Sequence, residues 1–140
     1  MAGRYGMSFA KKHIEDGDYE DAVRVTTEEI DGGTASPETW VDRATALDLL
    51  ERHAESVNDF ERAIELDRDA RELTLEDVDD AYFSALASAA MRAAKASPRD
   101  GLALLDRYAR ALPDGRHLGD VEEWKKRVTG ELVSVLDKTK

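Results

Sequence analysis

Residues 37–69 read PETWVDRATALDLLERHAESVNDFERAIELDRD, and this stretch decides the fold of the chain. Its apolar residues recur three or four positions apart, which is the spacing that places side chains on one face of an α-helix. Bulky and small residues alternate in an order that lets two antiparallel helices interlock. The stretch therefore predicts one helical hairpin, and the residues that carry the pattern are Trp40, Ala44, Leu47, Phe60, Ala63 and Leu66.

The order of these residues resembles a tetratricopeptide repeat, a helical hairpin whose period is 34 residues. In that family a Trp precedes a small residue by four positions, and a large apolar residue follows three positions later, as Trp40, Ala44 and Leu47 do here. When the chain is compared with itself at an offset of 34, Ala10 also falls on Ala44. The resemblance implies an all-α fold in which antiparallel hairpins stack into a right-handed superhelix.

The first repeat matches the pattern less well than the second. At the same offset, Gly6 corresponds to Trp40 and Thr26 corresponds to Phe60, so the first hairpin lacks both large side chains. We therefore expect the first hairpin to pack less tightly than the second.

Turn and capping signals set the limits of the predicted helices. Gly17, Gly32 and Gly33 mark helix ends, because glycine accepts the left-handed backbone that is common there. Ser36-Pro37 and Ser97-Pro98 each combine a capping hydroxyl with a proline at the first helical position, where the missing N–H costs nothing. These two dipeptides predict the starts of two helices.

Beyond residue 70 the repeat period lengthens. The segment from Leu75 to about Ala96 contains no Gly or Pro and is rich in alanine, a composition of high helix propensity. We expect one domain, residues 1–140, with about seven helices. Its predicted parts are repeat 1 over about residues 3–36, repeat 2 over about 37–70, an extended divergent repeat 3 over about 74–113, and a C-terminal capping helix over about 120–138.

The composition describes an acidic protein. Thirty-one acidic residues against 20 basic ones give a formal charge of −11, which repels nucleic acid and anionic membranes. The absence of cysteine excludes a disulfide framework and a thiolate nucleophile. No window approaches the roughly 18 apolar residues of a membrane span. We therefore expect a cytoplasmic protein that binds neither nucleic acid nor membrane.

The sequence contains no motif that predicts catalysis, a cofactor or a metal. The acidic run at residues 76–80 lacks the glycine and glutamate spacing of a calcium loop, and acidic residues are expected in the first turn of a helix. His13, His53 and His117 are too far apart in sequence to form a zinc motif. We interpret His13 as a core or groove residue and the other two as solvated, and we expect Trp40 and Trp124 to pack in the core.

The resemblance to the tetratricopeptide family also implies a binding surface. In that family the first helix of each repeat lines a concave groove, in which a bound peptide contacts the second, fifth, ninth, twelfth and thirteenth helical positions. The matching candidates are Arg4, Met7, Lys11, Ile14, Val41, Thr45, Asp48 and Leu49. Glu15 and Glu38 occupy two further positions of this set.

One specialisation of the family is missing. The clamp that grips the acidic tails of heat-shock chaperones requires basic and amide side chains, whereas the matching positions here are Met7, Lys11 and Asp42. A carboxylate at Asp42 would repel such a tail.

We therefore expect a non-enzymatic adaptor or scaffold that holds a protein or peptide partner in this groove. Two alternatives stay open. In the first alternative, the chain forms a structural homodimer through its terminal repeats, without a peptide ligand. In the second, its own long third-repeat helix fills the groove.

Overall fold

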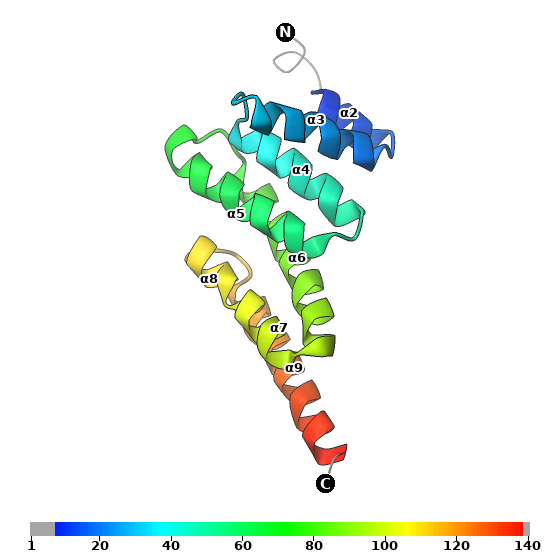
Figure 1. Cartoon of the computed structure of the whole chain (residues 1–140). Coiled ribbons are helices and arrows are strands. Elements are labelled where there is room, and N and C mark those ends of the chain that lie inside the picture. Colours follow the sequence, from blue (N-terminus) through cyan, green and yellow to red (C-terminus); the bar gives the residue numbers. More distant parts are fainter. Residues whose placement is uncertain (1–7, 139–140) are drawn as a thin grey trace. The chain divides into compact units, whose positions relative to one another are not determined.

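The structure is a computed structural model that describes residues 8–138, with side chains described as far as residue 130. Every regular element in this part of the chain is a helix, and none is a strand, which confirms the predicted all-α fold (Figure 1). When α7 and α8, which only Asp106 separates, are counted as one interrupted helix, the described residues form seven helices, as expected. No helix in this part of the chain combines the length and the apolar character that a membrane span requires.

The chain divides into two compact units, Met1–Val78 and Asp79–Lys140. Helix α6 (Leu75–Ala96) contributes its first turn to the first unit and its other residues to the second. The predicted single domain and its repeat limits stay predictions.

The first unit contains α2 (Phe9–Glu15), α3 (Tyr19–Asp31), α4 (Pro37–Leu49) and α5 (His53–Ala70), followed by the first turn of α6. Each helix packs against the next, and α2 also contacts α4. The turns use the predicted glycines, since Gly17 and Gly33 have φ values of +84° and +78°. Helix α4 begins at Pro37, as the sequence predicts.

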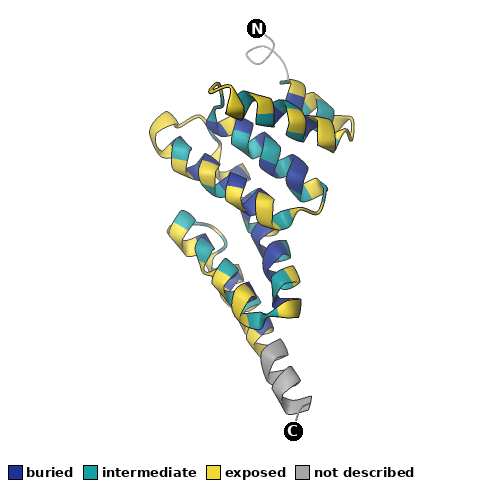
Figure 2. Cartoon of the chain, viewed as in Figure 1, coloured by how far each residue is buried: buried dark blue, intermediate teal, exposed yellow. Residues whose placement is uncertain are grey.

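Helices α4 and α5 are the best packed pair of the first unit. Ala44 and Ala63 are fully buried, and Phe60 is 1% exposed. Buried residues recur along both helices (Figure 2). The Ser56 hydroxyl, also fully buried, donates to the carbonyl oxygen of Ala44 at 2.7 Å, which joins the two helices. These small residues let the two backbones approach closely.

The first hairpin buries less. Helix α2 buries only Ala10 among its seven residues, and Phe9 is 70% exposed. At the position that corresponds to Phe60, Thr26 is fully buried and donates to the carbonyl oxygen of Ala22 at 2.7 Å within its own helix. The hydroxyl is satisfied locally, but it does not replace the contacts of an aromatic ring.

The second unit consists of the rest of α6, α7 (Pro98–Leu105), α8 (Arg107–Ala111) and α9 (Leu118–Lys138). The sequence predicts one amphipathic helix from Pro98 to Leu112, whereas the structure interrupts it at Asp106. Helices α6 and α7 come very close at Gly101, where a β-carbon would lie 2.8 Å from the carbonyl oxygen of Ala90 and 2.8 Å from the β-carbon of Ala94.

The two tryptophans are less buried than expected. Trp40 and Trp124 are both half-buried. An arginine covers each ring, since the guanidinium carbon of Arg43 lies 5.1 Å from the Trp40 ring centre and that of Arg127 lies 4.8 Å from the Trp124 ring centre. The expected core role is therefore met only in part, because each ring shares its surface with a cation.

Replacing Gly101 by Ala should destabilise the second unit. The added methyl group would overlap α6, and relieving such an overlap in a packed interface costs about 1–3 kcal/mol. We expect a lower melting temperature by circular dichroism. The matched control is Gly119→Ala, because nothing lies within 4 Å of a β-carbon at Gly119, and this change should leave the melting temperature unchanged or raise it. Equal melting of both variants would contradict the close approach.

Candidate functional site

A pocket of about 580 Å³ lies in the first unit, between α2, α4 and the segment that leads into α6. Its volume falls within the range of known ligand sites. It contains both apolar and acidic side chains. We call it the groove pocket, and its lining residues are Lys11, Ile14, Glu15, Glu38, Val41, Asp42, Thr45, Glu72, Leu73, Thr74, Asp77 and Val78.

Four of the residues expected in the binding groove line this pocket, namely Lys11, Ile14, Val41 and Thr45. Glu15 and Glu38, which the resemblance also places on the groove, line it as well. The expected groove residues of α2 and those of α4 therefore lie around the same pocket, as residues on the facing sides of two packed helices should.

The other expected groove residues do not line the pocket. Asp48 and Leu49 come from the last turn of α4. The Asp48 carboxylate pairs with His53, whose Nδ1 lies 2.5 Å from its Oδ1, and Leu49 is 47% exposed. Arg4 and Met7 lie outside the described residues.

Sequence reasoning missed one wall of the pocket, the segment 72–78. Asp67 holds this segment in place, because its Oδ1 accepts hydrogen bonds from the backbone N–H groups of Glu72 at 2.7 Å and Leu73 at 2.9 Å. Asp67 is only 4% exposed. Helix α5 is followed by Arg71, which has a φ of +52°, and because this residue is not a glycine the sequence contains no signal for the turn.

Lys11 of α2 reaches two carboxylates of α4. Its Nζ donates to Asp42 Oδ1 at 2.9 Å and also to Glu38. Burial alone would lower the pKa of Lys11, but the hydrogen bonds and charges of Glu38 and Asp42 outweigh burial and raise it. Lys11 is therefore a stable cation whose charge is matched within the site.

Asp42 is the most enclosed carboxylate of the groove pocket, at 6% exposed. Burial raises its pKa, and the neighbouring Glu38 acts in the same direction, while Lys11 opposes both. The Ser8 hydroxyl also donates to Asp42, at 3.4 Å. The sequence singled out Asp42 only as a departure from the chaperone clamp, whereas the structure makes it the link between α2 and α4.

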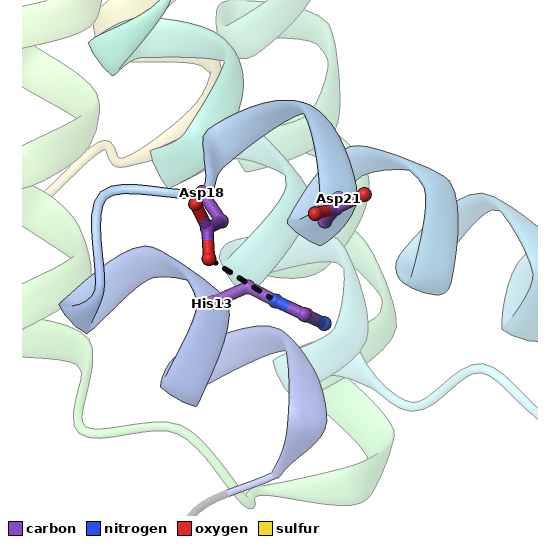
Figure 3. Close-up of side chains that lie close together, drawn as sticks. All are labelled: His13, Asp18 and Asp21. Carbon is purple, nitrogen blue, oxygen red and sulfur yellow. Dashed lines mark ion pairs between the residues drawn. The ribbon is translucent and has the colours of Figure 1, made fainter.

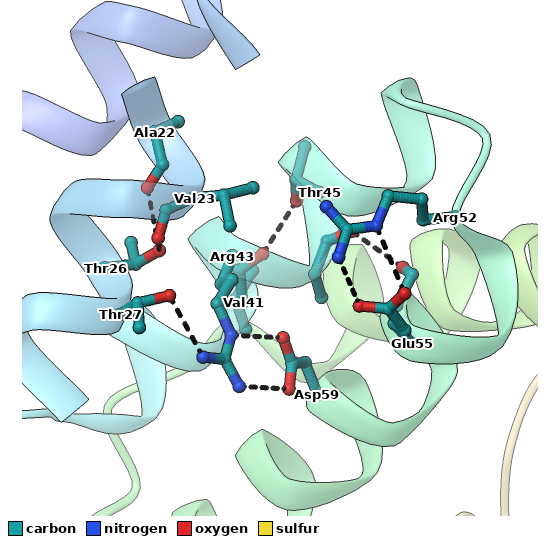
Figure 4. A network of polar contacts seen from close by, with 12 residues as sticks. Ala22, Val23, Thr26, Thr27, Val41, Arg43, Thr45, Arg52, Glu55 and Asp59 are labelled. Atoms are coloured by element: carbon teal, nitrogen blue, oxygen red, sulfur yellow. Dashed lines mark hydrogen bonds and ion pairs between the residues drawn. The ribbon is translucent and has the colours of Figure 1, made fainter. Parts of the chain in front are cut away.

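A second polar network fixes α4 against α3 and α5 (Figure 4). Arg43 donates to both carboxylate oxygens of Asp59, from Nε at 2.7 Å and from Nη2 at 3.0 Å, and its Nη1 donates to Thr27 Oγ1 at 3.2 Å. Asp59 is 5% exposed, and this two-pronged pairing satisfies it. These residues do not line the groove pocket, so their contribution is to hold α4 in position.

The fold brings His13 close to two carboxylates that sequence spacing did not connect with it (Figure 3). His13 Nδ1 lies 4.0 Å from Asp18 Oδ2, and the nearest ligand atoms of His13, Asp18 and Asp21 lie within 4.8 Å of one another. Ligand atoms around a tetrahedral zinc ion are separated by roughly 3.4 Å. The distance between His13 Nδ1 and Asp18 Oδ2 is longer than this spacing, and Asp21 also pairs with Arg24 at 3.7 Å.

In the second unit, His117 is not the solvated turn residue that we expected. Its ring stacks on Phe83 with centres 4.4 Å apart, and its side chain is 20% exposed. Its Nε2 lies 2.6 Å from Asp80 Oδ1 and its Nδ1 lies 2.8 Å from Asp120 Oδ2. Burial alone would lower the pKa of His117, but its hydrogen bonds to Asp120 and Asp80 outweigh burial and raise it. The imidazolium joins α6 to α9.

Buried polar contacts support this bridge. Tyr108, fully buried, donates to Asp79 Oδ1 and accepts from the backbone N–H of His117 at 2.9 Å. The backbone N–H of Arg116 donates to the other Asp79 oxygen at 2.8 Å. Burial and the hydrogen bond to Asp79 raise the pKa of Tyr108, so the phenol stays protonated and keeps donating. This network fixes the loop before α9.

The stability of the second unit should fall as the pH rises through the pKa of His117. The folded state raises this pKa above its ordinary value of 6.5, so the contribution is complete below that value and is lost above the folded pKa. We expect the melting temperature of His117→Gln to change less between pH 6 and pH 9, roughly the range over which histidine titrates, than that of the parent chain. Identical pH dependence would contradict the bridge.

Comparison of the chain with protein-family models, with curated proteins and with solved structures finds no match. What the groove pocket binds must therefore be inferred from its own residues. These combine a half-buried apolar surface, a matched ion pair and several exposed carboxylates.

Proposed function

We propose that the chain is a non-enzymatic, tetratricopeptide-like interaction module of the cytoplasm, which acts as an adaptor or scaffold. It holds a segment of a partner protein in the groove pocket. The observation that carries the proposal is that pocket itself, of about 580 Å³, whose lining includes six of the α2 and α4 residues that the sequence resemblance assigns to a bound peptide.

The shape of the pocket supports this role. Within the first unit, Thr74 and the first-turn residues Asp77 and Val78 of α6 form part of the wall and leave the pocket open. The apolar residues Ile14 and Val41 come from neighbouring helices, so one anchor side chain of a peptide can contact both. Affinity in such grooves comes from apolar anchors, and polar groups at the rim select among them.

The electrostatics favour binding over catalysis. A nucleophilic or basic lysine needs a lowered pKa, whereas the pKa of Lys11 is raised by Glu38 and Asp42. Lys11 therefore joins α2 to α4 and does not supply a reactive amine.

Replacing Val41 by Asp should reduce peptide binding without unfolding the chain. Val41 is half-buried on the pocket wall, and a carboxylate there removes the apolar anchor site and adds charge. Peptides are first selected from a displayed random library for binding to the parent chain. We expect these peptides to bind Val41→Asp at least about tenfold more weakly than the parent chain, a loss of roughly 1.4 kcal/mol in binding free energy. Fluorescence anisotropy measures the affinities.

The matched control is Leu118→Asp, which places the same charge on an exposed leucine of the second unit, 37% exposed. Its affinities should equal those of the parent chain, and circular dichroism should show unchanged helicity in both variants. Peptides that bind all three proteins equally would show that binding occurs elsewhere.

Self-association is the second candidate function, and the exposure of Phe9 favours it. A phenylalanine that is 70% exposed on the terminal hairpin could contact a second copy of the chain. Size-exclusion chromatography with light scattering distinguishes the candidates. Under the adaptor proposal we expect a monomer, whereas a dimer that is independent of concentration and that Phe9→Ser dissociates would favour the structural homodimer.

A further inference from the structure

The groove pocket carries negative charge that its own cation does not balance. Among the described residues, five carboxylates line it, but only one cationic side chain does, that of Lys11. Lys11 is already paired with Glu38 and Asp42. The carboxylates that remain are Glu15, Glu72 and Asp77.

These three carboxylates come from different parts of the first unit but share the same pocket. Glu15 ends α2, Glu72 lies in the segment before α6, and Asp77 lies in the first turn of α6. All three are exposed. Among residues whose side chains the structure describes, none of the three has a basic partner. A cation from outside could therefore approach them without displacing an existing ion pair.

Apolar side chains form the other component of the pocket. Ile14, Val41 and Leu73 are half-buried, so each keeps part of its surface available to a ligand, and Val78 is 5% exposed. An apolar surface surrounded by unmatched carboxylates is complementary to an aliphatic side chain that has a cation nearby.

We propose that the groove pocket binds a basic segment of a partner protein, in which an aliphatic side chain lies close to an arginine or lysine. The aliphatic side chain packs on the apolar residues of α2 and α4, and the cation is held by Glu15, Glu72 and Asp77. This inference rests on the proposed function, since it names the class of partner for the same pocket.

Arginine suits this site better than lysine. Its guanidinium group can pair with two carboxylates at once, and its methylene stem can pack along the apolar surface. Asp42 also favours a cationic ligand. Burial and Glu38 raise its pKa, which means that they destabilise its charged form, and a further positive charge in the pocket would stabilise that form. An acidic segment would meet the like charge of Glu15, Glu72 and Asp77 and is disfavoured.

The test uses synthetic peptides of about twelve residues in which one leucine and one arginine are placed at varied spacings. Each peptide is paired with a copy in which citrulline, which has the shape of arginine without its charge, replaces the arginine. Affinities for the full chain are measured by fluorescence anisotropy at low and high salt. We expect the best arginine peptide to bind about tenfold more tightly than its citrulline copy at low salt, with the ratio falling toward one at high salt.

The double variant Glu15→Gln with Glu72→Gln should remove the discrimination. Its arginine and citrulline peptides should bind with nearly equal affinity. The matched control is Glu20→Gln with Glu65→Gln, which changes the net charge by the same amount on exposed residues outside the pocket lining and should keep the discrimination. Circular dichroism melts verify that both double variants fold.

The outcomes separate this inference from the proposed function. If the citrulline copies bind as tightly as the arginine peptides and Val41→Asp still abolishes binding, the partner class is wrong and the binding role stands. If the two double variants lose discrimination equally, the pocket carboxylates are not responsible and the inference is also wrong. If no peptide binds the parent chain more tightly than Val41→Asp, both proposals are wrong.

Discussion

Helix α4 can pack closely against α5 because the side chains between them are small, and the rest of the first unit depends on this contact. Ala44 and Ser56 meet there, and the Ser56 hydroxyl donates to the Ala44 carbonyl oxygen at 2.7 Å. Helix α4 also contacts α2 and α3, so each of its faces has a different neighbour. With one face held on α5 and Arg43 bound to Asp59, the face that carries Val41 and Asp42 has one fixed direction, toward the groove pocket.

Local signals predicted the fold well where they act within one helix. Ser36-Pro37 predicted the start of α4, and the lack of Gly and Pro predicted both limits of α6, Leu75–Ala96. The break at Asp106 was not predictable, because Leu102, Leu105 and Tyr108 keep helical spacing through it and so contain no sign of an interruption.

The candidate site was predicted only in the part that repeats. Lys11 and Val41 occupy equivalent faces of two similar helices, so a periodic argument could locate both. The wall at residues 72–78 depends on Asp67 capping two backbone N–H groups after its own helix has ended, which no periodicity reveals. His117 was misjudged for a similar reason, because its partner Asp80 is 37 residues away in sequence. Contacts of this kind exist only once the helices have packed.

Asp42 has a large effect on the charge balance of the groove pocket, because it pairs with Lys11. The sequence resemblance matches Asp42 to an amide position of the chaperone clamp, where a carboxylate would repel an acidic tail. Here Asp42 is a buried carboxylate, and together with Glu38 it takes up the charge of Lys11. Lys11 is the only cation among the described residues that line the pocket, and it is used to hold α2 against α4. Glu15, Glu72 and Asp77 are therefore left without a basic partner among those residues. Under the proposed binding role, the carboxylate of Asp42 disfavours an acidic segment, and the carboxylates that Lys11 leaves unpaired favour a basic one.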